Sequence, residues 1–197
     1  MGCAISGLEA KADFGERNRE DAAAPPSDHQ IDIIKESWNV IREDIAKVGI
    51  IMFVRLFETH PECKDVFFLF RDVEDLEKLR SSRELRAHGL RVMSFIEKSV
   101  ARLDQRDRLD ALALELGRSH YHYNASPKYY SYVGAEFLCA VQPILKDRWT
   151  SELEEAWKTM FQYVSILMRQ GYQEEHDQQR HLAASPKDTP DKKNTAL

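Results

Sequence analysis

Cysteines and long apolar runs are both scarce in this sequence. The 197 residues include three cysteines, one of them at position 3, and so few cannot form the disulfide framework of a small secreted domain. No apolar run approaches the roughly 18 residues that cross a bilayer, and the N-terminus carries no apolar secretory signal. The sequence therefore favours a reducing, cytosolic environment and predicts no membrane-spanning helix.

Clusters of basic residues are missing as well. The net charge is −5, and Lys and Arg are not gathered with interleaved aromatic residues, so we expect no nucleic-acid partner. The chain is 43% hydrophobic, which is enough for one well-formed core, and its length predicts one folded domain. We expect this domain to be a monomer.

No alternating pattern of the kind typical of β-strands competes with the helical periodicity, and no internal repeat is present. The sequence therefore predicts an all-α fold. Ser27 or Asp28 is placed to cap the first helix, and the last helix is expected to begin after Thr150 or Ser151 and to end at Gly171.

Both ends of the chain are polar, poor in large apolar residues and interrupted by prolines. We expect residues 1–28 to form a flexible tail, residues 29–173 to form the folded domain, and residues 174–197 to form a disordered C-terminal tail. Within the folded part, the charged segment Arg71–Arg80 is expected to be a loop.

Two histidines fall on apolar faces of different helices. Leucines spaced by three and four residues lead along one helical face to Leu116 and then to His120. His88 lies on a second such face, three residues after Leu85. Each helix is therefore expected to direct an imidazole into the core, and two facing imidazoles can clamp a metal held in a flat cofactor.

Two other interpretations of these histidines exist. A histidine on an apolar face is often a core residue whose ring nitrogens bond to the backbone, and this alternative stays open. A zinc site made of His88, His120 and His122 is less consistent with the pattern. On a helix, His122 lies about 200° around the axis from His120 and faces elsewhere.

The first six residues match the pattern for N-terminal acylation. Gly2 follows the initiator Met and Ser6 lies four positions later, as in myristoylated proteins. Cys3 is placed where a palmitoyl group is commonly added, and stable membrane binding requires such a second signal. We expect Gly2 and Cys3 to be lipidated; the alternative is an unmodified, disordered tail.

The order of several residues resembles that of the globin family over residues 29–173. Trp38, Pro61 and Phe67 precede the two histidines, which are 32 residues apart. That separation and the segment Leu116–His120 are similar to neuroglobin, whereas the acylation pattern and the long tails look like the membrane-bound globin X group. The resemblance implies a globin fold, with seven to eight helices around a haem pocket.

The resemblance also implies roles for individual residues. His120 corresponds to the proximal ligand of a haem b iron and His88 to the distal one. His120 Nδ1 is expected to donate to a backbone carbonyl near Leu116, which leaves Nε2 for the iron. Arg91 is either the partner of a haem propionate or a solvated charge. The other residues expected to line an apolar pocket are Phe53, Phe67, Val92, Tyr130 and Val133.

Cys63 and Cys139 lie on segments that pack near each other in globins. A redox-sensitive disulfide between them is therefore conceivable. Two reduced, buried thiols are the usual state in the cytosol, and the sequence leaves both possibilities open.

The resemblance implies O2, NO and CO as ligands, and nitrite as a further one. We expect a haem protein held by acyl chains on the cytoplasmic face of the plasma membrane, with an electron-transfer or nitrite-reducing role and an unidentified reductase as partner. No dedicated catalytic motif is present. One alternative is a conventional oxygen carrier, store or sensor, and another is a haem-free signalling module.

Overall fold

The computed structural model describes residues 24–67, 69–73 and 75–184. This described part is built from seven α-helices and contains no β-strand, which confirms the predicted all-α fold. The predictions for Gly2 and Cys3 lie outside it. The helices are α1 (Asp28–Ile41), α2 (Ile45–Thr59), α3 (Leu76–Arg80), α4 (Arg83–Val100), α5 (Arg106–His122), α6 (Tyr130–Leu145) and α7 (Ser151–Ala184), with short 3-10 turns η1 (Arg42–Asp44), η2 (Pro61–Val66), η3 (Pro127–Tyr129) and η4 (Lys146–Arg148).

The first and last helices begin where the sequence predicts. Ser27 Oγ accepts a bond from the Gln30 backbone at 3.3 Å, and the Gln30 side chain accepts from the Ser27 backbone at 3.0 Å. This reciprocal pair satisfies two of the N–H groups that a helix start leaves unpaired. Thr150 Oγ1 accepts from the Leu153 backbone at 3.1 Å and caps α7 in the same way.

The expected loop Arg71–Arg80 contains a helix, so that prediction was wrong in its second half. Residues Leu76–Arg80 form α3, and Asp75 caps it by accepting a bond from the Glu77 backbone at 3.0 Å. An acidic cap at the positive end of a helix stabilises it. The high charge of the segment therefore did not prevent a helical turn.

The predicted end of the last helix at Gly171 was also wrong. Helix α7 continues to Ala184, so residues 174–184 are helical and are not part of a disordered tail. No proline stands between Gly171 and Pro186, and side chains four residues apart support the extra turns. Gln170 bonds to Glu174 at 2.9 Å and Gln179 to Glu175 at 2.8 Å.

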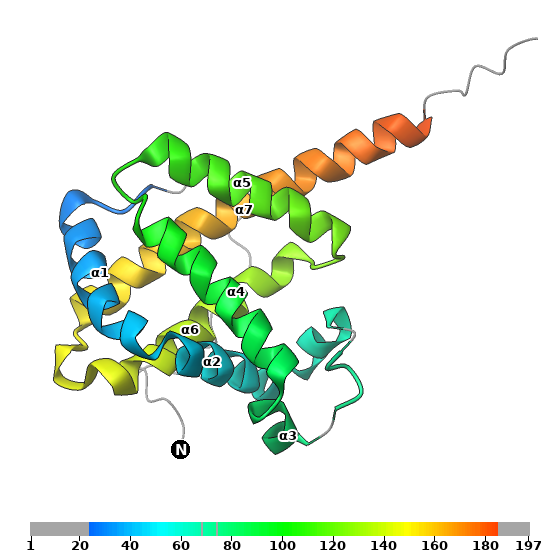
Figure 1. The fold of residues 1–197 in the computed structure, drawn as a ribbon. Helices are drawn as coiled ribbons and strands as arrows, with labels where there is room; N and C mark the ends of the chain where they lie inside the picture. The colour runs from blue at the N-terminus through cyan, green and yellow to red at the C-terminus, as the bar shows by residue number, and fades with distance from the viewer. Residues whose placement is uncertain (1–23, 68, 74, 185–197) are drawn as a thin grey trace, which may run out of the picture.

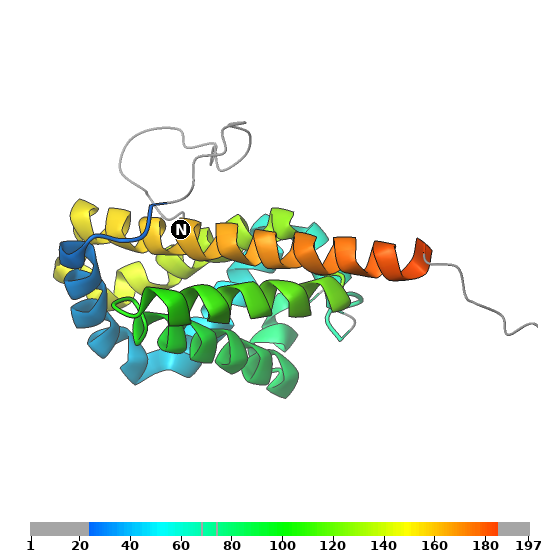
Figure 2. The same cartoon turned by 90° about the horizontal axis from the view of Figure 1, so that it is seen from above.

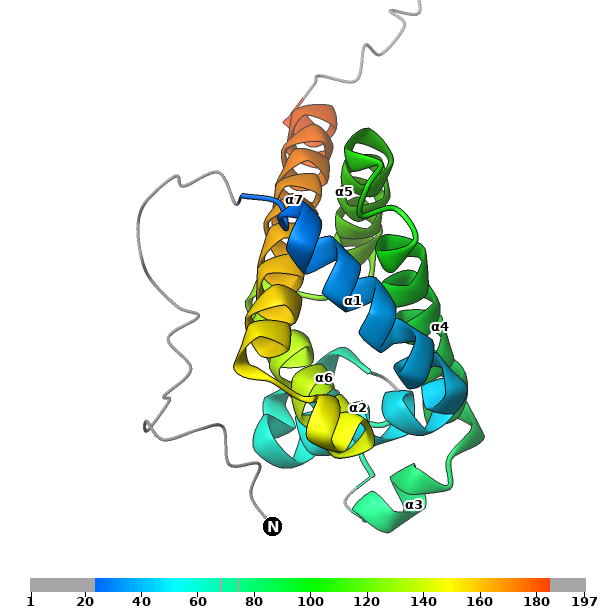
Figure 3. The same cartoon turned by 90° about the vertical axis from the view of Figure 1, so that its left-hand side faces the viewer.

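The helices pack as a bundle with crossed pairs. Helix α1 crosses between α7 and α4 (Figure 3), and α2 packs against α4 and α6. Helices α5 and α7 lie side by side along most of α5 (Figure 2). The C-terminal end of α7 then projects beyond the body of the domain (Figure 1).

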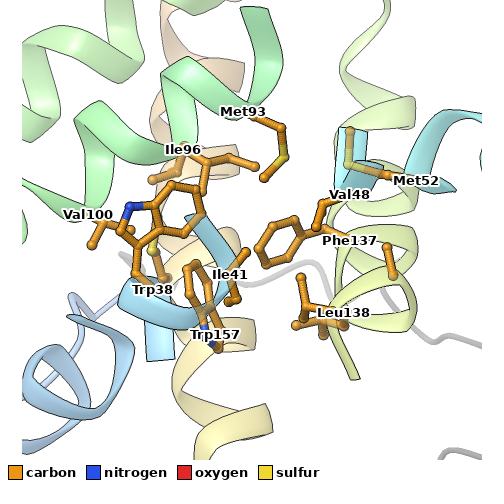
Figure 4. Packing of buried hydrophobic residues seen from close by; sticks show 14 of the residues in the cluster. Trp38, Ile41, Val48, Met52, Met93, Ile96, Val100, Phe137, Leu138 and Trp157 are labelled. Atoms are coloured by element: carbon orange, nitrogen blue, oxygen red, sulfur yellow. The ribbon is translucent and has the colours of Figure 1, made fainter. Parts of the chain in front are cut away.

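Trp157 of α7 lies at the centre of the core (Figure 4). Its side chain is fully buried, and its ring centroid lies 6.3 Å from that of Trp38 and 5.0 Å from that of Phe137. The indole N–H donates to Ser37 Oγ at 3.1 Å, so the one polar atom of the ring is satisfied. Burying about 200 Å² of such a side chain contributes roughly 5 kcal/mol, which ties α1, α6 and α7 together.

Helices α5 and α7 touch through their backbones. A Cβ atom built on Gly117 would lie 2.0 Å from the Met168 carbonyl oxygen, and one on Gly171 would lie 2.1 Å from the Leu114 carbonyl oxygen. Glycine is the one residue that permits this approach, because it has no side chain. Each helix therefore supplies a glycine where the other helix comes closest.

We predict that Gly117→Ala lowers the free energy of unfolding by about 3 kcal/mol, because the added methyl group meets backbone that cannot move aside. Gly134→Ala is the matched control. A Cβ there would lie 3.2 Å from the Phe161 side chain, which can shift, so this variant should stay within about 1 kcal/mol of wild type. Urea unfolding of the purified protein measures both values, and equal losses would contradict the backbone contact.

Candidate functional site

His88 of α4 packs against two phenylalanine rings. Its ring centroid lies 4.8 Å from that of Phe53 on α2 and 4.9 Å from that of Phe67, which follows η2, both in edge contacts. The two phenylalanines are themselves 5.8 Å apart. The structure therefore brings together three residues that the sequence assigned to one pocket.

His120 of α5 makes the backbone bond that the sequence predicts. Its Nδ1 donates to the Leu116 carbonyl oxygen at 2.8 Å, and a carbonyl oxygen can only accept. The proton of the neutral ring is thus held on Nδ1, and Nε2 keeps a free lone pair. No residue in the described part of the chain bonds to that Nε2, so it is available as a metal ligand.

Both imidazoles have lowered pKa values. The pKa of His88 is lowered to about 4 by burial first, then by the Arg91 charge and by His120. Burial also lowers the pKa of His120, against an opposing effect of the bond to Leu116. Both rings are therefore neutral at pH 7, which is the form of histidine that ligates metals.

Tyr130 of α6 supplies a buried polar atom without a partner. Its ring lies 5.4 Å from that of His120, and its hydroxyl group has no hydrogen bond within the described residues. Burial raises the pKa of this hydroxyl, so it stays protonated. An unpaired buried hydroxyl costs about 1–3 kcal/mol, so this atom is a polar group that a bound molecule would satisfy.

Three further residues of the predicted site lie on the same helices. Val92 and Val133 are half-buried and pack against the core, four residues after His88 and three after Tyr130. They therefore share helical faces with these residues. Arg91 is exposed, and its guanidinium donates to His88 Nδ1 at 3.1 Å, a contact that the sequence analysis did not foresee.

His122 does not belong to the site. Its Nε2 pairs with Glu175 of α7 at 3.1 Å, on a different side of α5 from His120. Among the described residues, no group of three or more His, Cys, Asp or Glu side chains gathers where it could hold a metal ion. His88 and His120 offer two ligands at most, so a metal between them would take the rest from a cofactor.

The C-terminal half of α7 packs against the end of α5 through contacts that the sequence did not predict. Tyr121 packs edge-on against Tyr172, with ring centroids 5.4 Å apart. Arg118 pairs with Glu174 at 2.7 Å. These residues flank His120, and the helical spacing of Tyr172, Glu174 and Glu175 beyond Gly171 was the signal that could have identified them.

Cys63 in η2 is a buried free thiol, and Cys139 of α6 is also unbridged. Burial, followed by the nearby Glu62 charge, raises the pKa of Cys63 to about 12, against a smaller opposing effect of Lys128. This thiol is therefore protonated under ordinary conditions.

None of the described helices has the length and apolar character of a membrane-spanning segment.

Comparison with known proteins gives consistent matches. The family model described as Globin matches residues 51–168. Neuroglobin of Danio rerio is 31% identical over 140 residues, covering 71% of this chain and 88% of the relative. Cytoglobin-1 of Oryzias latipes is 27% identical over 161 residues, covering 81% of this chain and 91% of the relative.

Two solved structures share the fold. A hexacoordinated haem protein from an anhydrobiotic tardigrade aligns with a TM-score of 0.71 at 22% identity, covering 76% of this chain and 96% of the other. The haemoglobin of the botfly Gasterophilus intestinalis aligns with a TM-score of 0.69 at 17% identity, covering 75% and 99% respectively.

We predict that Cys63 in the folded protein reacts with iodoacetamide at pH 8 about a thousandfold more slowly than glutathione does, because little of its thiol is ionised. Unfolding in urea should remove the difference. Mass spectrometry of the Cys63 peptide measures the rate. Labelling at the rate of glutathione, or a Cys63–Cys139 disulfide in protein kept under a thiol reductant, would contradict a buried, protonated thiol.

Proposed function

This chain belongs to the globin family, and we propose that it binds haem between α4 and α5, with His120 as the fixed iron ligand and His88 as a displaceable one. The observation that carries the proposal is the bond from His120 Nδ1 to the Leu116 carbonyl at 2.8 Å. It leaves Nε2 of His120 free to bind a metal.

The residues present fit a haem. When bound, haem supplies an iron that binds small gaseous ligands such as O2, NO and CO and exchanges one electron. Phe53 and Phe67 offer apolar ring edges beside His88, as a porphyrin pocket requires. The unpaired Tyr130 hydroxyl is a further polar group for a bound molecule, and a haem-free module would leave it unsatisfied.

We propose haem b, a form that is not attached covalently. Covalent attachment uses a Cys-x-x-Cys-His segment. The cysteines of this chain are at positions 3, 63 and 139, and none of them precedes a histidine in such a segment. The protein would therefore hold the cofactor through the two imidazoles and the apolar walls alone.

An iron held by two imidazoles suits electron transfer. His88 and His120 would ligate the iron of a bound haem in both oxidation states, so little rearrangement would accompany the gain or loss of an electron. An external ligand must wait for His88 to leave, and its apparent affinity falls in proportion to the open fraction. These properties support a redox role, such as nitrite reduction with electrons from a reductase, over bulk oxygen storage.

Oxygen carriage or sensing is the second candidate, and the contact of Arg91 with His88 favours it. Because Arg91 donates to His88 Nδ1, the proton of the neutral ring lies on Nε2. In that form Nε2 donates a hydrogen bond to a ligand in the pocket and does not bind iron. The two candidates therefore differ in which nitrogen of His88 carries the proton.

We also propose that the protein is a membrane-anchored globin of the globin X type. Gly2, Cys3 and Ser6 support this proposal through the myristoylation pattern and the adjacent palmitoylation site. Two acyl chains would hold the haem domain at the cytoplasmic face of the plasma membrane. Reactive species that form in lipid, and membrane reductases, would then be close to the iron.

We predict that His120→Ala loses most of its haem during purification, because its only fixed iron ligand is gone. His88→Ala should retain haem and show a five-coordinate ferrous absorption spectrum, whereas the wild type shows a six-coordinate one. The spectra of the reduced proteins without added ligand measure both effects. An unchanged ferrous spectrum in His88→Ala would show that His88 does not bind the iron.

We predict that the ferrous protein reduces nitrite anaerobically. Nitrite would take up two protons from the buffer and one electron from the ferrous iron of a bound haem, giving nitric oxide and water and leaving the iron ferric. His88→Ala should react roughly tenfold faster or more, because its site is always open. Stopped-flow absorption measures the rate. A wild-type protein that is inert to nitrite yet holds O2 for hours would instead support the oxygen carrier.

We predict that Gly2→Ala moves the protein from the membrane fraction to the soluble fraction of cells, because myristoylation requires Gly2. Cys3→Ser should weaken attachment less completely, since one acyl chain still gives partial binding. Fractionation followed by immunoblotting measures the distribution. A Gly2→Ala variant that remained wholly in the membrane fraction would contradict acyl anchoring.

A further inference from the structure

The contact between Arg91 and His88 involves Nδ1 of His88, which is not the nitrogen proposed to bind iron. We propose that Arg91 is a positioning residue that sets the balance between a ligating and a hydrogen-bond-donating His88. This inference rests on the proposed function of His88. It adds that one exposed side chain, Arg91, controls whether His88 binds iron or donates a hydrogen bond.

The chemistry of the contact allows one direction only. Arginine has N–H donors and no acceptor, so the 3.1 Å contact requires that His88 Nδ1 accept. A neutral imidazole has one proton, which must then be on Nε2. For Nε2 to bind iron, the proton must move to Nδ1, where it would point at the guanidinium. Ligation by His88 and the bond from Arg91 therefore exclude each other.

The surroundings of His88 keep its ring in place for this contact. Phe53 and Phe67 touch the ring from two sides at centroid distances of 4.8 and 4.9 Å. Arg91 lies three residues later on the same helix, at a spacing that places two side chains on one face. No other residue in the described part of the chain bonds to either ring nitrogen of His88. Arg91 thus acts without a competing partner.

His120 has the opposite arrangement. Its Nδ1 meets the Leu116 carbonyl, which accepts the Nδ1 proton and so favours Nε2 as a ligand. The two histidines therefore have partners of opposite kind, an acceptor at His120 and a donor at His88. This difference explains why one ligand is fixed and the other is displaceable, although both rings are half-buried and neutral.

The expected effect of Arg91→Met is a stronger bond between His88 and the iron. Losing one charge-assisted hydrogen bond shifts an equilibrium by about tenfold. The ratio of six-coordinate to five-coordinate ferrous protein should rise by that factor. The apparent affinity for CO should fall by the same factor. Arg91→Lys keeps a donor without an acceptor and should lie closer to wild type.

The experiment uses the full-length, haem-loaded protein. Ferrous protein saturated with CO is diamagnetic, so long-range nitrogen–proton NMR correlations of His88 report which ring nitrogen carries the proton. Wild type should show Nε2–H, and Arg91→Met should show a rising share of Nδ1–H. Absorption spectra and CO titrations of the same samples give the coordination equilibrium.

Two controls separate this role from a general charge effect. Arg86→Met removes the same charge from an exposed position of α4 that lies about 200° around the helix axis from His88, and it should leave both readouts unchanged. In a His88→Ala background, Arg91→Met should no longer alter CO affinity. Any of three results would overturn the inference. Arg86→Met could have an equal effect, the effect of Arg91→Met could persist without His88, or the Nε2–H signal could stay unchanged in Arg91→Met.

The test also distinguishes this inference from the proposed function. If His88 never binds the iron, wild type and His88→Ala share one ferrous spectrum, and the displaceable ligand is refuted. The NMR signal would still show whether Arg91 holds the proton on Nε2. If His88 does bind but Arg91→Met changes neither readout, the proposed function stands and the role of Arg91 is refuted.

Discussion

The backbone contact between α5 and α7 is the constraint on which the site depends. Gly117 and Gly171 each lie against a carbonyl of the opposite helix, where a Cβ would come within 2.0 and 2.1 Å of oxygen. Helices this close cannot slide or rotate without a clash. His120 is less than one turn after Gly117, and its Nδ1 is bonded to the residue before that glycine. The orientation of the imidazole is therefore determined by the packing of whole helices.

The helix of His88 is held equally well, but its side chain is not. Gly89, the next residue, packs against Gly49 of α2 with a built Cβ at 3.0 Å from backbone, so α4 is fixed at this point. The imidazole itself meets two phenylalanine edges, and its one hydrogen bond within the described residues comes from an exposed arginine. An exposed arginine retains several rotamers, and ordering it costs entropy. The backbone is therefore fixed at both histidines, while the ring of His88 can change position at lower cost than that of His120.

Local patterns made much of this site predictable. The spacing of Leu116 and His120 placed both the imidazole and its acceptor, because the side chain and the carbonyl are separated by a single helical turn. The length of α7 and the pairing of Arg118 with Glu174 could not be derived in the same way. They depend on two helices that are distant in sequence, and polar composition alone suggested a tail. The direction of the Arg91 side chain also depends on packing, since its spacing from His88 allows either a propionate or the ring as partner.

The two candidate functions do not require two different sites. A ligating His88 and a hydrogen-bond-donating His88 have the same atoms, the same charge and the same neighbouring residues, and differ in the position of one proton.

Family membership determines the fold but not the position of this proton. The choice depends on what meets Nδ1, because a donor there leaves the proton on Nε2 and an acceptor moves it to Nδ1. A globin with a carbonyl at both Nδ1 positions would favour two ligating imidazoles. In this chain, Nδ1 of His120 meets a carbonyl, whereas Nδ1 of His88 meets a guanidinium. The energy that separates the two functions is then that of a single hydrogen bond at the surface, small enough to be altered by one substitution while the rest of the fold is unchanged.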